Sequence, residues 1–484
     1  MTSITSARSL GLAVAITVVG ALTAPTAFAA PAAPAAPAKP ASVQSDDFNG
    51  DGYRDVVTTT RAMHISGTNR PAQVAVVYGA KTAALHAKKQ TLKTNRAGVP
   101  ARPSYDFDAR TATTSADLDR DGYADLVVGT PGEDQPGSTE REGSGALSVF
   151  WGGKTGLNPV PSVVKGNGGY LAAGDFDGDK NPDIATLDGG NFRVHKGPFQ
   201  RSGAAASTKL IANPHEVVRD VAVGDFNGDR ITDLVTVDNV QDGPSMLSTR
   251  FWKGTKSGLA AAGSLSKYPG GERVALGDIN KDGFDDIVLG RPDRGLTDEG
   301  VPEAKGGRII HIPGSAKGPV TAKRKLINQN STGVPGTAVW GDHFGSDVAI
   351  ADVNGDKYAD VVVGAPGKDV GGKKDAGAVI VLRGAKTGLA AAGGAVFTQD
   401  TASVPGTAEK NDYFGGGLRL TDFNRDGRAD LIAGADGEDL SHGAVWALKG
   451  SAAGITAKGS VSFGPRVVGI TPVPYYGFGL GFNH

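Results

Sequence analysis

The stretch DVNGDKYADVVVGAPG, residues 352–367, joins two unlike halves. The first half places Asp352, Asn354, Asp356 and Asp360 at the first, third, fifth and ninth positions of a short loop. Carboxylates this close repel one another, and their burial is costly unless a cation neutralises them. The second half opens with VVVG, a β-branched run that is typical of a buried strand. The stretch therefore predicts a cation-binding loop that leads directly into a β-strand.

The same loop pattern occurs seven times along the chain. The copies begin at Asp47, Asp117, Asp175, Asp225, Asp278, Asp352 and Asp422. An apolar run that ends in Gly and a turn follows most copies, as in VIVLRGAKTGL (379–389), and another apolar run precedes several, as in SDVAIAD (346–352). Helical periodicity is almost absent. Each repeat therefore predicts about four short strands separated by turns.

Repeats of about 65 residues with four strands each indicate an all-β fold. We expect a seven-bladed β-propeller of four-stranded antiparallel blades over residues 44–484. A string of separate small β domains is the alternative. It is disfavoured because one blade cannot bury both of its faces and because the spacing leaves no linkers.

The two ends of the repeat array predict how the ring closes. Full repeats carry an aromatic-Gly element before the carboxylates, such as Phe344-Gly345, whereas only ASVQSD precedes the first loop. The chain ends in VPYYGFGLGFNH, which contains the missing element. We therefore expect Tyr476 to Phe482 to pair with the first blade, which would remove an exposed sheet edge.

Every copy offers a set of oxygen ligands. The side chains at positions 1, 3, 5 and 9 are Asp47, Asn49, Asp51 and Asp55; Asp117, Asp119, Asp121 and Asp125; Asp175, Asp177, Asp179 and Asp183; Asp225, Asn227, Asp229 and Asp233; Asp278, Asn280, Asp282 and Asp286; Asp352, Asn354, Asp356 and Asp360; and Asp422, Asn424, Asp426 and Asp430. The backbone carbonyl at position 7 would add Tyr53, Tyr123, Asn181, Ile231, Phe284, Tyr358 and Arg428. Oxygen-only loops with this spacing are the usual host of Ca²⁺, which accepts six to eight oxygens at flexible angles. The sequence therefore predicts up to seven calcium sites, with Mg²⁺ as the second choice because it demands stricter geometry.

Position 6 of the loop requires a sharp turn, for which glycine with a positive φ angle is typical. The residues at this position are Gly52, Gly122, Lys180, Arg230, Gly283, Lys357 and Gly427. A non-glycine residue in that conformation costs on the order of 1 kcal/mol, so we expect the three loops with Lys or Arg to bind more weakly. An EF-hand is excluded, because it requires Glu at position 12 and a following helix, whereas every copy continues as a β run without that Glu.

Composition narrows the class of protein. The chain has 484 residues, no cysteine, and 50 Lys and Arg against 51 Asp and Glu. This balance gives no reason to expect nucleic acid as a partner, and no apolar run after residue 29 is long enough to span a membrane. Residues 1–29 are typical of a secretory signal, with Arg8 as the only charge and an apolar segment over 10–22. Residues 30–43 form a Pro/Ala-rich linker, so we expect a secreted protein that no disulfide stabilises.

The repeat resembles the FG-GAP repeat of integrin α-subunit propellers and of bacterial secreted FG-GAP/VCBS-type proteins. HFGSDVAIADVNGDKYADVVVGAPG (343–367) carries all three parts, the Phe-Gly, the acidic loop and the Gly-Ala-Pro. The resemblance implies that each calcium loop joins the first and second strands of a blade on one face of the disc. It also implies that ligands meet the opposite face. The loops concerned there would be 130–143, 291–306, 365–377 and 435–443.

These observations favour a calcium-binding module outside the cell. Seven bound calcium ions would make a nearly neutral chain strongly cationic, so we expect an anionic extracellular polymer, or a cell-surface protein, as partner. The alternative is an enzyme on the same scaffold, a polysaccharide lyase or a hydrolase. Its catalytic candidates would be His442, in a predicted ligand-binding loop, and His343, beside a Phe-Gly element, although a lone histidine in a loop is usually solvated. Neither a Gly-x-Ser-x-Gly nor a His-Glu-x-x-His motif occurs. Trp340 is placed to stack on a sugar, although core packing is the more common role of Trp.

Overall fold

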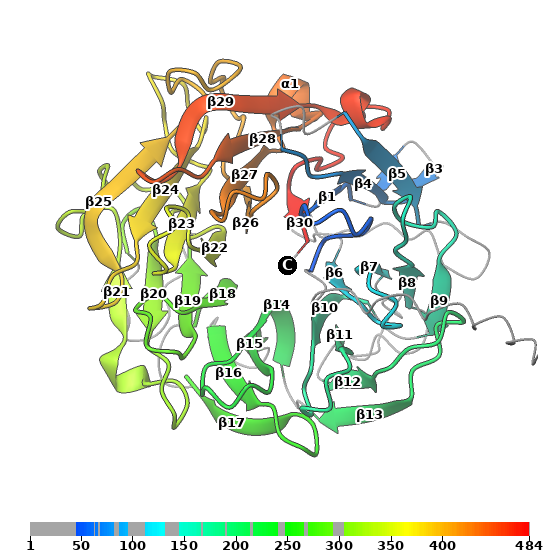
Figure 1. Cartoon of the computed structure of the whole chain (residues 1–484). Helices are drawn as coiled ribbons and strands as arrows, with labels where there is room; N and C mark the ends of the chain where they lie inside the picture. The colour runs from blue at the N-terminus through cyan, green and yellow to red at the C-terminus, as the bar shows by residue number, and fades with distance from the viewer. Residues whose placement is uncertain are drawn as a thin grey trace, which may run out of the picture. The chain divides into compact units, whose positions relative to one another are not determined.

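The computed structural model describes residues 45–61, 63–65, 68–81, 87–94, 112–130, 145–165, 168–188, 191–212, 216–240, 247–265, 270–293 and 304–483. All of them lie in one compact unit, Ala41–His484. The predicted signal (1–29) and linker (30–43) fall outside the described residues. In that unit, seven four-stranded antiparallel sheets form a seven-bladed β-propeller, as predicted (Figure 1).

Blades 2 and 3 follow the chain in order from the innermost to the outermost strand, whereas the innermost strand of blade 1 comes from the C-terminus. Blade 1 contains β30 (Gly481–Phe482), β1 (Val56–Thr59), β4 (Gln73–Val77) and β5 (Lys89–Lys93). Blade 2 contains β6 (Thr113–Ala116), β7 (Asp125–Thr130), β8 (Ala146–Phe150) and β9 (Ser162–Lys165). Blade 3 contains β10 (Tyr170–Gly174), β11 (Asp183–Asp188), β12 (Asn191–Lys196) and β13 (Ser207–Ala212).

The remaining four blades repeat this plan. Blade 4 contains β14 (Glu216–Gly224), β15 (Asp233–Val240), β16 (Leu247–Lys253) and β17 (Ala260–Ser264). Blade 5 contains β18 (Arg273–Gly277), β19 (Asp286–Arg291), β20 (Arg308–Ile312) and β21 (Lys325–Ile327). Blade 6 contains β22 (Val348–Ala351), β23 (Asp360–Ala365), β24 (Ala378–Arg383) and β25 (Ala390–Phe397). Blade 7 contains β26 (Gly417–Thr421), β27 (Asp430–Ala435), β28 (Ala444–Lys449) and β29 (Thr456–Phe463).

The C-terminal segment closes the ring, as predicted. Phe482 pairs with Thr58 and Gly481 with Thr59, so β30 is the innermost strand of the first blade. Tyr476 adds two contacts, because its carbonyl accepts a hydrogen bond from the Arg61 N–H and its hydroxyl lies against the Pro71 carbonyl. The first blade is therefore built from both ends of the propeller sequence.

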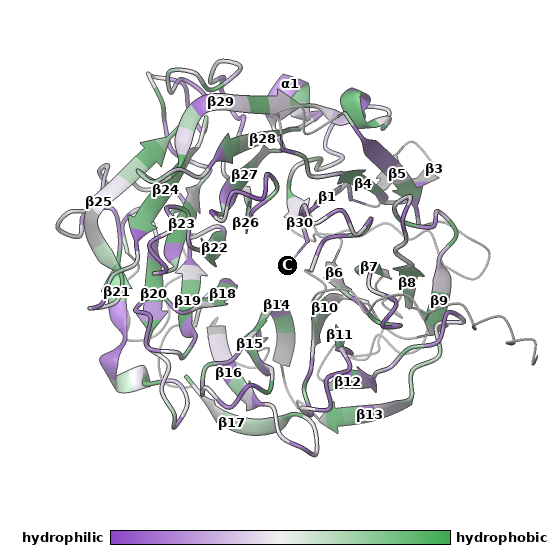
Figure 2. Ribbon diagram, in the orientation of Figure 1, coloured by the Kyte–Doolittle hydropathy of each residue, from purple (hydrophilic) through white to green (hydrophobic). Residues whose placement is uncertain are grey.

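The hydrophobic core lies between blades. Seven clusters of buried side chains occur, one between each pair of neighbours, including blades 7 and 1. Strands such as β23 and β27 are buried along their whole length, and Figure 2 shows hydrophobic residues concentrated on strands such as β24. A strand that packs on both faces reads as a continuous apolar run, which explains sequences such as DVVVGA.

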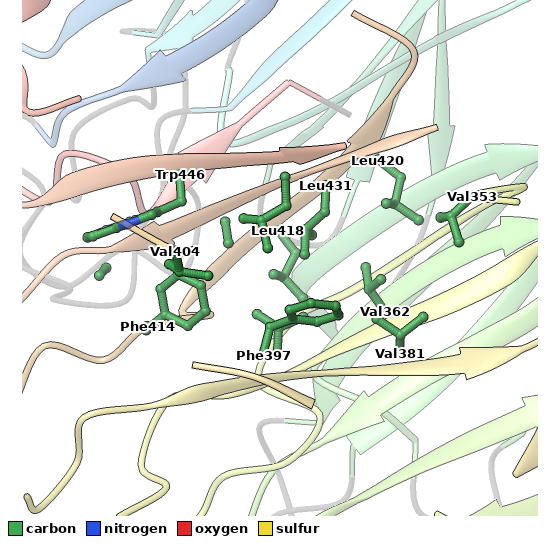
Figure 3. Packing of buried hydrophobic residues seen from close by; sticks show 14 of the residues in the cluster. Val353, Val362, Val381, Phe397, Val404, Phe414, Leu418, Leu420, Leu431 and Trp446 are labelled. Carbon is green, nitrogen blue, oxygen red and sulfur yellow. The ribbon is translucent and has the colours of Figure 1, made fainter. Parts of the chain in front are cut away.

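The cluster between blades 6 and 7 shows the packing (Figure 3). Leu420 of blade 7 faces Val362 of blade 6, and Trp446 lies at the other end of the cluster beside Val404 and Phe414. The ring of Phe414, the Phe of a Phe-Gly element, meets the ring of Trp446 edge to face with centroids 5.4 Å apart. Burial of side chains of this size contributes roughly 1.5–3 kcal/mol each.

Three details lie outside the predicted plan. A two-stranded hairpin, β2 (Met63–Ile65) and β3 (Thr68–Arg70), interrupts the connection between β1 and β4. A single helical turn, α1 (Glu438–Ser441), occupies the connection between β27 and β28. Two 3₁₀ turns cover Thr321–Lys323 and Pro465–Val468. Across the residues that the structure describes, no helix has the length and apolar character needed to cross a membrane.

Candidate metal centres

In blades 2 to 7 the acidic loop joins the first strand of the blade to the second, as the resemblance implies. In blade 1 the loop leads into β1, whereas the first strand, β30, comes from the C-terminus. In blades 2 to 7 the Asp at position 9 is the first residue of the second strand, for example Asp360 in β23. The residue at position 2 is an apolar anchor with at most 1% of its surface exposed. The seven anchors are Phe48, Leu118, Phe176, Phe226, Ile279, Val353 and Phe423. Core packing therefore fixes one end of every loop and a strand fixes the other.

Side-chain oxygens of the loop organise its own backbone. In all seven loops Oδ2 of the Asp at position 1 accepts the N–H of position 6, at 2.7–3.1 Å. In all seven, Oδ1 of the Asp at position 5 accepts the N–H of position 7, at 2.8–3.1 Å. A carboxylate oxygen has two lone pairs, so each one keeps capacity for an ion.

The Asp at position 9 is the most deeply buried of the predicted ligands, with at most 2% of its surface exposed in any loop. Its Oδ1 accepts, at 2.8–2.9 Å, the N–H of the glycine that follows the third strand of the same blade. These glycines are Gly79, Gly152, Gly197, Gly254, Gly314, Gly384 and Gly450. In five loops Oδ2 accepts the N–H of position 2, at 2.8–3.2 Å. The carboxylate thus joins the loop to the third strand.

The sequence showed these glycines as a recurrent turn but not their function. A Cβ atom added to Gly152 would lie 2.8 Å from the Tyr123 Cβ and would overlap the Ala124 carbonyl oxygen. The same overlap with the carbonyl at position 8 occurs in the other blades, for example at Gly384 with Ala359. Only glycine leaves room for the third strand to approach the loop and donate to the buried carboxylate.

Burial perturbs the position 9 carboxyls strongly. Desolvation raises the pKa of Asp55 and Asp125 to about 8, and the neighbouring carboxylates of each loop raise it further. The same causes raise the pKa of Asp183 and Asp430 to about 7, although backbone N–H donors act in the opposite direction. Such carboxyls are costly to ionise in the empty loop, and a cation beside them would remove that cost.

The residue at position 6 does not by itself distinguish the seven loops by their backbone strain. Position 6 has a positive φ in all seven, including Lys180 at 71° and Lys357 at 71°, as predicted. Position 4 also has a positive φ in all seven, and there Arg120, Lys281 and Arg425 replace glycine. Six of the loops therefore carry one strained non-glycine residue each, and the loop at Asp47 carries none. Backbone strain therefore does not set Lys180, Arg230 and Lys357 apart from Arg120, Lys281 and Arg425. The weaker binding expected at the first three loops stays a prediction.

In two blades, three carboxylates of the predicted ligand set lie close together. Oxygens of Asp117, Asp119 and Asp125 lie within 4.8 Å of one another, and so do those of Asp175, Asp177 and Asp183. The other five loops have Asn at position 3, so their third oxygen belongs to an amide. In two of them that amide nitrogen now contacts the position 9 carboxylate, as Asn227 does with Asp233 at 2.6 Å. Rotation of the amide by half a turn would present its oxygen instead.

Sequence reasoning missed the basic side chains from outside the loops that contact four of them. One is Arg383 of β24, whose Nη1 lies 3.4 Å from Asp360 Oδ2 in the sixth loop. Arg201 reaches the second loop from the neighbouring blade, with its Nε 2.5 Å from Asp119 Oδ2 and a further contact to Asp121. Lys196 pairs with Asp177, and Lys253 pairs with Asp229 at 3.0 Å. Arg201 is separated from its partners by about 80 residues, so only the register of the blades brings them together.

The donor set fits a hard divalent cation. Each loop offers carboxylate or amide oxygens from positions 1, 3, 5 and 9 on one short segment, and neither sulfur nor imidazole belongs to the predicted set. In the fifth loop His311 lies 3.4 Å from Asp286 through its Nε2 and is itself 1% exposed. This imidazole beside the position 9 carboxylate distinguishes the surroundings of the fifth site.

Two of the four predicted ligand-binding loops on the opposite face, 365–377 and 435–443, are fully described. Most of 130–143 and 291–306 lies outside the described residues. Trp340 is 58% exposed, so the expectation of core packing is wrong for this residue. Its turn is fixed by buried carboxylates, since Asp342 accepts the Val339 N–H and Asp293 accepts the Gly341 N–H.

The two histidines named as catalytic candidates have different settings. His343 has a φ of 57°, and its backbone N–H donates to Asp293 Oδ1 at 3.0 Å. It therefore belongs to the same turn as Trp340. His442 follows the helical turn α1 and is half-buried. Among the described hydrogen bonds, none joins the imidazole ring of either histidine to a Ser, Asp or Glu side chain that would activate it.

Comparison with known proteins gives one consistent family. The FG-GAP repeat matches residues 109–150, 270–309, 344–382 and 414–448. The FG-GAP-like repeat matches residues 175–236 and 225–289. Together these segments cover more than half of the chain and include six of the seven acidic loops.

Individual relatives match over shorter stretches. Integrin alpha pat-2 of Caenorhabditis elegans is 39% identical over 132 residues, which are 25% of this chain and 10% of that protein. Integrin alpha-8 of Mus musculus is 31% identical over 173 residues, 35% of this chain and 14% of that protein. A phosphatidylinositol-glycan-specific phospholipase D of Dictyostelium discoideum is 30% identical over 129 residues, 24% of this chain and 14% of that protein. The matches thus span between a tenth and a seventh of these curated relatives.

Among solved structures, the Dos1 propeller covers 85% of this chain and 84% of its own, with 9% identity and a TM-score of 0.37, which supports no inference about function. The family matches, the integrin α likeness and the seven four-stranded blades agree with one another. The chain belongs to the FG-GAP repeat proteins and is a β-propeller of the integrin α-subunit type.

Proposed function

We propose that this protein is a secreted, calcium-stabilised propeller that acts as an extracellular binding module for an anionic polymer. The observation that carries the proposal is the buried Asp at position 9, present in all seven blades and surrounded by further oxygen donors. A fold that buries seven such carboxylates gains stability when a cation neutralises them. Positions 1, 3, 5 and 9 and the carbonyl of position 7 would hold each ion.

Calcium would act here as a structural ion. At roughly millimolar calcium and a Kd near 0.1 mM, each occupied site adds about 1.4 kcal/mol to the free energy of unfolding. Seven sites would add about 10 kcal/mol, which is comparable to the whole stability of an ordinary domain. The chain has no cysteine, so ions would do here what disulfides do in many proteins outside the cell.

The number of bound calcium ions would also determine the class of partner. The net charge is −1, and seven divalent ions would add fourteen positive charges to one face of the disc. A surface of that charge attracts polyanions, so wall polymers or acidic polysaccharides are the expected class of partner. Secretion rests on residues 1–29, which have the charge and apolar pattern of a signal sequence.

A calcium titration of the mature protein tests the proposal. We expect calorimetry to give several sites per chain and thermal melting to show a large loss of stability in chelator. Magnesium at the same concentration should restore only part of that stability. Unchanged melting in excess chelator, with no metal by elemental analysis, would contradict the calcium role.

Electrophoretic mobility and binding assays test the partner. Calcium should move the protein toward the cathode and should allow it to bind an acidic polysaccharide but not a neutral one of the same length. Substitution of Asp356 by Ala, in the loop at Asp352, should weaken both effects. Glu409→Ala, at an exposed residue outside the acidic loops and the predicted ligand-binding loops, should leave them unchanged. Turnover of pectin, mannuronan or ester substrates by the purified protein would instead show that it is an enzyme.

A further inference from the structure

The seven loops contact one another around the ring. Position 4 of one loop meets position 7 of the next. Where position 4 is glycine, the side chain at position 7 covers it, as Tyr123 covers Gly50, Ile231 covers Gly178, Phe284 covers Gly228 and Arg428 covers Gly355. Where position 4 is basic, its side chain reaches position 7: Arg120 donates to Asn181 Oδ1 at 3.0 Å, and Lys281 lies 5.7 Å from the centre of the Tyr358 ring. Arg425 of the seventh loop lies against Gly52 of the first. No loop is therefore an isolated site.

A backbone hydrogen bond accompanies these side-chain contacts. The N–H of position 8 donates to the carbonyl of the Asp at position 1 in the preceding loop, at 2.8–3.1 Å. The bonds run from Ala124 to Asp47, Thr232 to Asp175, Asp285 to Asp225, Ala359 to Asp278 and Ala429 to Asp352. Each bond ends on the residue that begins the neighbouring set of ligands.

The peptide group that makes this bond is the same one that carries the carbonyl of position 7. In a trans peptide the C=O and the N–H point in opposite directions from one plane. Because the N–H points to the preceding loop, the C=O points away from it, on the side of its own loop. An ion held by that C=O would polarise the peptide and strengthen the N–H bond to the neighbour.

Five of the seven possible backbone links are therefore formed, and none of the described bonds runs from Arg54, at position 8 of the first loop, to Asp422. The link from the third loop to the second is missing for a chemical reason. Position 8 of the third loop is Pro182, which has no N–H to donate to Asp117. The loop otherwise keeps the common hydrogen bonds, including Lys180 N–H to Asp175 and Gly197 N–H to Asp183. Proline at this position is thus compatible with the loop and removes only the backbone hydrogen bond between the second and third loops, while the bond from Arg120 to Asn181 remains.

Two links are doubled. Asp225 donates its own N–H to Asp285 Oδ2 at 2.7 Å while its carbonyl accepts the Asp285 N–H. Asp175 does the same with Thr232, whose Oγ1 accepts at 3.1 Å. These reciprocal pairs make the third, fourth and fifth loops the most tightly connected part of the ring.

We propose that the peptide between positions 7 and 8 couples neighbouring sites, so that the loops bind calcium cooperatively in a series that is interrupted at Pro182. The inference rests on the proposed calcium binding and adds a regulatory property to it: occupancy of one loop favours occupancy of the loop before it. Two-way coupling follows, because a binding free energy shared between two sites is reciprocal.

Calorimetric calcium titration of the full chain and three variants tests this coupling. Pro182→Ala restores an N–H with the residue that three other loops already have at position 8. Ala359→Pro removes the link between the sixth and fifth loops. Pro159→Ala, at an exposed turn position outside the ring, controls for the change in proline content. We expect a Hill coefficient above 1 for the wild type, a higher one for Pro182→Ala and a lower one for Ala359→Pro, with the number of sites unchanged.

The outcomes separate the coupling from the proposed function. If calcium binds with the expected stoichiometry but with a Hill coefficient of 1, and Pro182→Ala changes neither the Hill coefficient nor the midpoint, the coupling is wrong and the calcium sites stand. If no calcium binds, the proposed function itself fails. Should Ala359→Pro not fold, Pro182→Ala decides alone. A shift of the Pro182→Ala midpoint to two- to threefold lower calcium supports the coupling.

Discussion

Arg419 of the last blade forms an ion pair with Asp46, the residue before the first loop, with its Nη2 2.5 Å from Asp46 Oδ2. Asp46 is 1% exposed and also contacts Asn483 at the C-terminus and Ser115 of blade 2. One carboxylate therefore joins both ends of the propeller sequence and the blades on either side of the closure. A buried ion pair that loses one partner leaves an uncompensated charge, which is strongly destabilising.

Replacement of Asp46 by Asn tests this junction. Asn tolerates the positive φ of 68° at this position but gives Arg419 no negative charge. We expect the free energy of unfolding to fall by about 2–3 kcal/mol in saturating calcium. Asp439→Asn, at an exposed residue with a φ of 52°, is the matched control and should change stability by less than about 0.5 kcal/mol. Equal effects of the two substitutions in chemical denaturation would contradict the assignment.

Removal of residues 474–484 tests closure as a whole. The deletion takes away β30 and the buried rings of Phe478 and Phe482, and it exposes the inner edge of β1. A buried Phe replaced by Ala costs roughly 3–5 kcal/mol, so we expect the deletion to cost at least that much and to promote aggregation. Thermal melting and light scattering measure both effects. A melting temperature equal to that of the intact chain would show that the ring does not depend on this strand.

The two adjacent glycines of the second blade offer a paired test of the link between loop and third strand. A Cβ at Gly152 would overlap the Ala124 carbonyl, whereas a Cβ at Gly153 would have no neighbour closer than 3.9 Å. We expect Gly152→Ala to lower stability by about 2 kcal/mol and to impair calcium binding by the second loop. Gly153→Ala should do neither. Loss of one site in calorimetry for both variants, or for neither, would refute the function given to Gly152.

The repeat made most of this architecture predictable. Seven acidic loops, each beside an apolar run, fixed the number of blades, and the displaced aromatic-Gly element indicated that the C-terminus closes the first blade. What the sequence could not provide is contact between blades. The pairing of Arg201 with Asp119 and the overlap that requires glycine at Gly152 depend on how one strand lies against a distant loop. Exposure of Trp340 likewise depends on buried carboxylates that hold its turn, which no local pattern reveals.

Arg201 gives a test of competition between a protein cation and calcium. Its guanidinium contacts Asp119 and Asp121, two predicted ligands of the second site, and its side chain is 54% exposed. Because solvent screens such a pair, we expect Arg201→Ala to lower stability in chelator by at most about 1 kcal/mol. In the same variant the calcium affinity of the second loop should rise by about fivefold, since the ion no longer displaces a competing cation. Lys154→Ala, at an exposed residue of blade 2, which carries the second loop, is the control for surface charge. An unchanged or lower calcium affinity in Arg201→Ala would contradict competition.

Burial of His195 predicts a pH dependence of the folding stability that does not arise from the metal sites. It lies in β12 with 3% of its surface exposed, and its Nδ1 is 3.1 Å from Thr208 Oγ1. Burial, with a smaller effect of Arg193, lowers the pKa of His195 to about 4, below the value of about 6.5 in an unfolded chain. Between these values the unfolded chain binds a proton and the folded chain does not. The contribution of His195 is therefore fully present above pH 6.5 and is lost as the pH falls toward 4, by about 3 kcal/mol at most.

The variant His195→Leu isolates this effect. Blades 6 and 7 have Leu382 and Leu448 two residues before the corresponding glycine, so leucine suits the position. We expect the difference in unfolding free energy between the wild type and the variant to change with pH between 6.5 and 4 and to be constant above pH 7. Chemical denaturation in saturating calcium at a series of pH values measures that difference. The titration of the carboxyl groups cancels from the difference because both proteins share these groups. A difference that stays the same from pH 7 to pH 4 would mean that His195 binds its proton equally well in the folded chain, which its burial among apolar side chains argues against.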